Sequence, residues 1–193
     1  MGTCVKKQSG FVLMEFLIVL AVMGIFGSIA FSIGKRVMDR VYSFADTKRL
    51  EYLVAEYTMA INSGQLDLTG VKNTVDFAVA LARAGGPNEV SAYQSQKRSN
   101  KQRKEILING EKNPDLKEED FDFMAYPVAC CNLPADRMPL FFSRGLRENG
   151  VWSKDSLYGT EGGLIAFADG HVETLRNAKQ IVADYLEHLE LAF

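Results

Sequence analysis

Asp169 and His171 are the first pair whose types and spacing could do chemistry, because a carboxylate beside an imidazole can orient it as a general base. The two residues flank Gly170, between two runs of β-prone residues. In such a hairpin turn the aspartate side chain stabilises the bend of the backbone, and the histidine side chain projects from the strand that follows. The pair therefore has a structural role. The chain also lacks a G-x-S-x-G motif or a similar nucleophile motif. We therefore predict that the chain is not an enzyme.

Metal and nucleic-acid sites have less support in the sequence. The chain has only two histidines, His171 and His188, so no zinc constellation is evident. The basic segment 97–104 could contact nucleic acid, but Tyr93 is the one aromatic residue nearby, and the net charge of −2 argues against a general nucleic-acid binder. We expect no cofactor and do not expect nucleic acid as a partner. Calcium stays an open alternative at an acidic run that lacks EF-hand spacing: Asp115, Glu118, Glu119, Asp120 and Asp122.

Cys130 and Cys131 are adjacent, and Cys4 lies near the amino terminus. Consecutive α-carbons are about 3.8 Å apart, below the usual disulfide window of about 4.4–6.8 Å, so a bridge between neighbours would be strained. An oxidising compartment could still favour that bridge, but we favour unbridged, structural cysteines. Because no framework of several disulfides is available, a hydrophobic core must hold the fold together.

Glu15 is the most informative charged residue, because it lies inside an apolar run. Residues 11–33 contain 18 apolar residues out of 23, enough for a helix that crosses a hydrocarbon layer of about 30 Å. Basic residues flank the run on both sides, so charge alone does not fix its orientation. An acidic side chain in a membrane helix is costly and by default marks a functional site whose partner must be found.

The residues around Glu15 resemble a known processing signal. The sequence Lys6-Lys7-Gln8-Ser9-Gly10 followed by Phe11-Val12-Leu13-Met14-Glu15 is similar to the amino-terminal signal of type IV pilins and type II secretion pseudopilins. Val12, Met14 and Phe16 differ from the residues usual in that family, without altering the cleavage site. The family's frequent proline late in the apolar segment is also missing here.

This resemblance implies roles for three residues. In the family, a membrane-embedded prepilin peptidase cuts after the leader glycine and the new amino-terminal phenylalanine is N-methylated, which here implies cleavage between Gly10 and Phe11. The resemblance assigns Glu15 to filament assembly, in which its carboxylate neutralises the new amine of a neighbouring subunit. A plain signal-anchor helix with a chance glutamate is the alternative.

The remaining pattern predicts an α+β fold in which a long amino-terminal helix packs on a small antiparallel sheet. We expect a leader at 1–10, a transmembrane helix at 11–34, an amphipathic continuation at 35–62 and a globular head at 63–193. The continuation is predicted from apolar residues spaced by three to four and ends at Asn62-Ser63-Gly64. Its apolar residues are Val37, Val41, Phe44, Leu50, Leu53, Val54, Tyr57 and Ile61.

Two further helices and several strands are expected in the head. A helix over Thr74–Arg83 should be capped by Asn73 and terminated by Gly85-Gly86-Pro87. Residues 87–120 are polar and suggest a long surface insertion, with a short strand at 106–108 before Asn109-Gly110. The segments predicted as strands are 121–130, 138–146, 163–167 and 171–175, and a closing helix should run from Ala178 to about Leu191.

The last two strands flank the Asp169-Gly170 turn, so we expect a hairpin in which Phe167 faces Val172. The sequence Phe-Ala-Asp-Gly-His-Val-Glu at 167–173 is similar to a carboxy-terminal signature of pseudopilin-like proteins from planctomycete and verrucomicrobial bacteria. We take Asp169, Gly170 and His171 as the core of this signature.

Together the two resemblances imply a structural subunit of a type II secretion pseudopilus, a helical filament that drives protein export. The implied partners are the prepilin peptidase, other pseudopilins, the inner-membrane assembly platform and membrane lipid. The implied location is the bacterial inner membrane, with a single span and the head in the periplasm, before extraction into a periplasmic or surface filament. Two alternatives stay open: a type IV pilus subunit for adhesion, motility or DNA uptake, and a single-span membrane-anchored ligand-binding protein.

Overall fold

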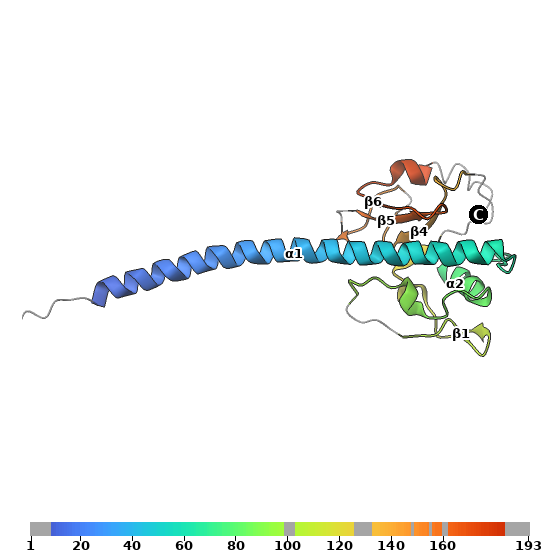
Figure 1. Cartoon of the computed structure of the whole chain (residues 1–193), viewed down its shortest axis with the longest axis horizontal. Helices are drawn as coiled ribbons and strands as arrows, with labels where there is room; N and C mark the ends of the chain where they lie inside the picture. The colour runs from blue at the N-terminus through green and yellow to red at the C-terminus, as the bar shows by residue number, and fades with distance from the viewer. Residues whose placement is uncertain are drawn as a thin grey trace, which may run out of the picture. The chain divides into compact units, whose positions relative to one another are not determined.

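The computed structural model describes residues 9–98, 103–125, 133–147, 149–154, 156–159 and 162–183, with the backbone alone at 9–13 and 36. The chain divides into two compact units, Met1–Val41 and Tyr42–Phe193. Helices and antiparallel sheets are both present, and the amino-terminal helix is the longest element (Figure 1). The predicted α+β class is therefore confirmed.

The long helix, α1, runs from Ser9 to Asn62 without a break. It is long and apolar enough to cross a membrane. In its first half apolar side chains are exposed in every direction, and Phe16, Phe26 and Phe31 are 60%, 67% and 78% exposed. A helix that is apolar all round is typical of a membrane span, whereas a surface helix of a soluble domain buries one stripe. The helix ends where predicted, and Gly64 follows with a φ of 68°.

The predicted apolar face of the continuation is only partly buried. Leu50, Leu53, Val54 and Tyr57 are at most 5% exposed and pack in the main core. In contrast, Val37, Val41, Phe44 and Ile61 are 52%, 53%, 66% and 47% exposed, so only part of the apolar pattern of this helix is buried. The buried face starts at Asp46, and Phe44 lies two residues away, about 200° around the helix.

Helix α2 spans Thr74–Arg83, as predicted. The Asn73 side chain accepts a hydrogen bond from the backbone N–H of Asp76 at 2.8 Å, which satisfies a free donor of the first turn. At the other end, Gly86 N–H donates to the Leu81 carbonyl at 2.9 Å, and Gly85 has a φ of 93°. The local rules for starting and ending a helix therefore place α2 correctly.

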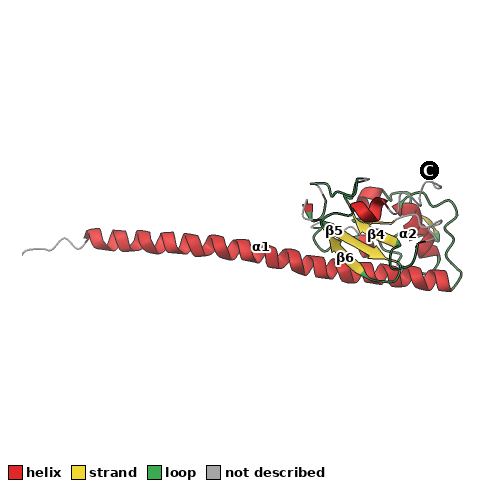
Figure 2. Ribbon diagram, turned by 90° about the horizontal axis from the view of Figure 1, so that it is seen from above, coloured by secondary structure: helices red, strands yellow, loops and turns green. Residues whose placement is uncertain are grey.

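The main sheet has four antiparallel strands in the order β3-β4-β5-β6. Figure 2 labels the last three of them. Their bounds are Phe123–Ala125 for β3, Pro139–Ser143 for β4, Gly163–Phe167 for β5 and Val172–Leu175 for β6. Successive side chains of a strand point to opposite faces of the sheet. The buried strand β5 therefore contributes side chains to two hydrophobic clusters, one on each face. Leu164 and Ala166 join the main core, while Ile165 and Phe167 join a smaller cluster with Trp152, Ala178 and Val182.

The register of the β5–β6 hairpin differs from the prediction. Val172 pairs with Ala166, so the expected pairing of Phe167 with Val172 is wrong. Gly170 N–H donates to the Phe167 carbonyl at 3.0 Å, Phe167 N–H donates to the His171 carbonyl at 2.9 Å, and Gly170 has a φ of 97°. Residues 168–170 therefore form a three-residue loop whose last residue is in the left-handed region. Compared with the expected two-residue loop, this shifts the pairing of the two strands by one position.

The segment from Pro87 to Asp120 is not simply a surface insertion. Val90, Tyr93 and Ile106 are fully buried in the main core. Two short 3-10 helices, η1 (Val90–Tyr93) and η2 (Glu118–Asp120), and a two-stranded sheet of β1 (Leu107–Ile108) and β2 (Glu111–Lys112) organise it. Asn109 and Gly110 join β1 to β2 with φ values of 52° and 82°, so the predicted strand before this turn is confirmed.

Gly163 is the position in the sheet with least room for a side chain. A Cβ atom there would collide with the Trp152 ring and the Ser143 hydroxyl. Gly163→Ala should therefore lower the free energy of unfolding of the head by about 1–3 kcal/mol, the usual cost of overpacking. Urea unfolding in detergent micelles, followed by the fluorescence of Trp152, the chain's one tryptophan, measures this. Gly24→Ala is the control, because nothing lies within 4 Å of its added Cβ; equal unfolding of both variants would contradict the prediction.

Candidate functional site

The residues predicted for processing and assembly lie at the start of α1. Gly10 and Phe11 are in the helical backbone near its first turn. Glu15 lies four residues after Phe11, about 6 Å along the helix axis at about 1.5 Å per residue. Its side chain is exposed, and its neighbours Met14, Ile18 and Val19 are exposed apolar residues.

Glu15 carries its charge on an exposed apolar surface of the helix. Among the residues that the structure describes, none forms a hydrogen bond or an ion pair with this carboxylate. Lipid offers no compensation for a charge at membrane depth, so a carboxylate there needs a partner from another molecule or a place near the bilayer surface. The geometry therefore leaves Glu15 available for a contact between molecules.

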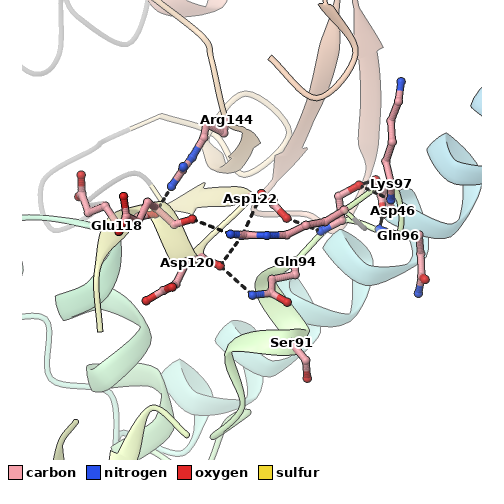
Figure 3. A network of polar contacts seen from close by, with 12 residues as sticks. Asp46, Ser91, Gln94, Gln96, Lys97, Glu118, Asp120, Asp122 and Arg144 are labelled. Atoms are coloured by element: carbon pink, nitrogen blue, oxygen red, sulfur yellow. Dashed lines mark hydrogen bonds and ion pairs between the residues drawn. The ribbon is translucent and has the colours of Figure 1, made fainter. Parts of the chain in front are cut away.

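The head contains a buried polar network that the sequence analysis missed (Figure 3). One of its members is Asp46 of α1, which is fully buried. Its carboxylate accepts hydrogen bonds from the Tyr158 hydroxyl at 2.6 Å, from the Gln96 backbone N–H at 2.8 Å and from the Ser95 hydroxyl. Three donors compensate the carboxylate for lost water. Burial, and then the bond to Asp46, raise the pKa of the Tyr158 phenol above its usual range, so it stays a donor.

One feature of the sequence does point to Asp46. It occupies the position four residues before Leu50 on a face that continues through Leu53 and Tyr57, where the pattern calls for an apolar residue. A lone acidic residue on such a face either interrupts the apolar packing or accepts hydrogen bonds inside the core. Only the structure shows which segments supply the donors.

The basic and acidic runs partly neutralise each other. Arg98 Nη1 lies 3.3 Å from Asp122 Oδ1, and Lys104 Nζ lies 3.0 Å from Asp120 Oδ2. Burial raises the pKa of the Asp122 carboxyl, while the backbone N–H of Ser95 and the charge of Arg98 oppose this rise. The structure finds no group of three or more His, Cys, Asp or Glu that could hold a metal ion within the parts of the chain it describes. The described residues of this acidic run therefore do not form a site for calcium.

The same network ties the segment around Gln94 to the segment 118–122. Arg98 donates to the carbonyls of Asp120 at 2.9 Å and Glu119 at 3.0 Å, and Gln94 Nε2 donates to the Asp120 carbonyl at 3.0 Å. Tyr93, the candidate aromatic for nucleic-acid stacking, is fully buried, and its ring centroid lies 5.4 Å from that of Phe121. It offers no surface on which a base could stack.

The hairpin signature brings Asp169 and His171 together. His171 Nδ1 lies 2.5 Å from Asp169 Oδ1, and the imidazole stacks on Phe167 with centroids 4.2 Å apart. Burial is the largest single influence on the pKa of Asp169 and raises it, but the hydrogen bonds from the His171 backbone and ring together outweigh burial and hold this pKa below its usual range. No described hydroxyl or thiol group hydrogen-bonds to the other ring nitrogen, so the pair lacks a nucleophile within that part of the chain.

Several predicted features lie outside the described residues. These are the leader 1–8, Cys130 and Cys131, His188, and the closing helix beyond residue 183. The beginning of that helix is present as helical residues 179–183, next to Ala178 and Val182 of the smaller cluster.

Comparisons of the chain with protein-family models, with curated proteins and with solved structures found no match.

Proposed function

We propose that the chain is a structural subunit of a type II secretion pseudopilus, processed by prepilin peptidase and assembled into a helical filament that drives protein export. One observation carries this proposal: Glu15 is a carboxylate without a partner among the described side chains, on an exposed apolar helix, five residues after the glycine of a prepilin-like leader. Cleavage after Gly10 would create a positive amine at Phe11, and each charge would then supply the partner that the other lacks.

The apolar half of α1 supports a subunit that exists in two environments. Its exposed side chains must be covered by lipid before assembly, because such a continuous apolar surface does not persist in water. In a filament the same side chains would be covered by the helices of neighbouring subunits. In this scheme the span lies in the bacterial inner membrane, and the head folds in the periplasm around its own core.

The amino terminus of the mature chain tests this proposal. In cells with an active prepilin peptidase, mass spectrometry of the purified chain should find N-methylated Phe11 as the first residue. Cells that lack the peptidase are the control and should yield the chain with residues 1–10 intact. An intact leader in both strains would contradict the proposal and would favour a chain that is simply anchored.

A single-span membrane-anchored binding protein is the second candidate, and one observation favours it. An open groove of about 470 Å³ lies in the head beside α1 and is lined by Lys48, Arg49, Tyr52, Pro87, Asn88, Glu89, Ser91 and Ala92. Much of its polar lining is already engaged: Arg49 donates to the Ser91 carbonyl at 2.9 Å, and Lys48 pairs with Glu51 at 2.6 Å. The groove thus offers few free groups to a ligand, and we prefer the filament subunit.

A further inference from the structure

Two basic side chains of α1 follow its apolar half, at the point where the uncharged stretch of the helix ends. Lys35 and Arg40 are exposed, and no hydrogen bond or ion pair joins either of them to another residue in the described part of the chain. Asp39 lies between them in the sequence, but it is partly buried and already takes part in an interaction. Lys35 and Arg40 are therefore two cations that can accept a counter-charge from another molecule.

The uncharged stretch before Lys35 has the length of the hydrocarbon core of a bilayer. It comprises the 19 residues 16–34, which include no Asp, Glu, Lys, Arg or His. At about 1.5 Å per residue this stretch extends for about 28 Å, and the hydrocarbon core is about 30 Å thick. A helix that places the stretch in the hydrocarbon core therefore brings Lys35 to one boundary of the core and Glu15 to the other.

The spacing of the two cations fits the headgroup layer beside the hydrocarbon core. Lys35 and Arg40 are five residues apart, which is about 7.5 Å along the helix axis. The headgroup region adds about 5–7 Å on each side of the hydrocarbon core. Long basic side chains lay their apolar stems along a helix and extend their charged ends toward this layer. Both charges can therefore reach the level of the lipid phosphates.

We propose that Lys35 and Arg40 bind the phosphate groups of anionic phospholipids, in the leaflet from which the chain continues into the head. A guanidinium can donate two parallel hydrogen bonds to a phosphate, and an ammonium adds a compact positive charge. A zwitterionic lipid cancels its phosphate with a positive group of its own, so the anionic class is preferred. The inference rests on the membrane span of the proposed function. It implies that the bound lipids hold Glu15 at the opposite boundary, where water can solvate its carboxylate before assembly.

Native mass spectrometry of the full-length chain in non-ionic detergent tests the inference. Equal amounts of dioleoylphosphatidylglycerol, which is anionic, and dioleoylphosphatidylcholine, which is zwitterionic, are added, and the ratio of the two bound lipids is measured. Each basic side chain near an anionic surface strengthens association by about fivefold. The variant Lys35→Gln/Arg40→Gln should therefore lower the ratio of bound phosphatidylglycerol to phosphatidylcholine by at least about fivefold. The variant Lys35→Arg/Arg40→Lys keeps both charges and should retain the preference.

Lys72→Gln/Arg83→Gln is the matched control, because it removes two exposed basic side chains from the head and should leave the ratio unchanged. The inference is overturned if the wild-type chain binds the two lipids equally, or if this control lowers the ratio as much as Lys35→Gln/Arg40→Gln does.

Vesicles of dioleoylphosphatidylcholine alone test the membrane span separately. An apolar helix needs no anionic lipid to insert, so the wild-type chain should stay in these vesicles through a carbonate wash. A chain that washes off would contradict the span and with it the proposed function. A chain that stays in the vesicles but shows no preference between the two lipids would contradict this inference alone.

Discussion

Glu15→Ala should leave the chain inserted in the membrane with a folded head but stop its assembly into filaments. The carboxylate has no partner within the part of the chain that the structure describes, so its removal should cost the isolated subunit little. In the proposed filament, the same change would leave the amine of a neighbouring subunit buried without a counter-charge. Breaking a buried ion pair by removing one partner costs about 3–5 kcal/mol. At about 1.4 kcal/mol for each factor of ten, the assembly constant should fall by at least about a hundredfold.

Filaments sheared from cells and quantified by immunoblot measure this effect, and the fluorescence of Trp152 verifies that the head is folded. Glu15→Gln keeps the shape of the side chain and should fail in the same way, because the charge is what matters. Met14→Ala is the matched control: this neighbour is 66% exposed and uncharged, so its loss should reduce assembly far less. Normal filament yield from Glu15→Ala would count decisively against the proposed pairing. The subunits found in purified filaments would then distinguish a secretion pseudopilus from a type IV pilus.

Features set by nearby residues were predictable from the sequence. Helix α2 is fixed at its start by Asn73 and Asp76 and at its end by Gly85, all within a few positions of the bond they make or the turn they allow. The Asn109-Gly110 turn is likewise local, because two successive residues with positive φ suit a tight hairpin. The same local rules found the β5–β6 hairpin but missed its register, since Asp-Gly fits both a two-residue and a three-residue loop.

Features that depend on distant residues could not be predicted. The donors to Asp46 lie 49, 50 and 112 positions along the chain, and no local pattern links them to α1. The apolar pattern of α1 also could not tell which of its residues the head covers. Phe44 and Leu50 look equivalent in the sequence, but Phe44 is 66% exposed and Leu50 is fully buried.

Asp46→Ala should lower the free energy of unfolding of the head by about 3–5 kcal/mol. The change removes the acceptor shared by three donors, and hydrogen bonds to a charged group contribute about 1.5–3 kcal/mol each without being additive. It leaves the Tyr158 hydroxyl and the Gln96 N–H to find new partners inside the head. Urea unfolding followed by Trp152 fluorescence gives the value. Glu51→Ala is the control on the same helix, because the exposed Lys48–Glu51 pair should contribute less than about 1 kcal/mol.

Tyr158→Phe keeps the test usable if Asp46→Ala unfolds the head altogether. It removes a single donor and should cost about 1.5–3 kcal/mol. If the hydroxyl stabilises the fold through Asp46, its loss should matter much less once the carboxylate is gone. The double variant should therefore be more stable than the sum of the single effects implies, by about 1 kcal/mol or more. Additive costs, or a cost below about 1 kcal/mol for Asp46→Ala, would mean that the carboxylate does not hold α1 to the head, which would then depend on the apolar contacts of Leu50, Leu53 and Tyr57 and on the Arg49 hydrogen bonds.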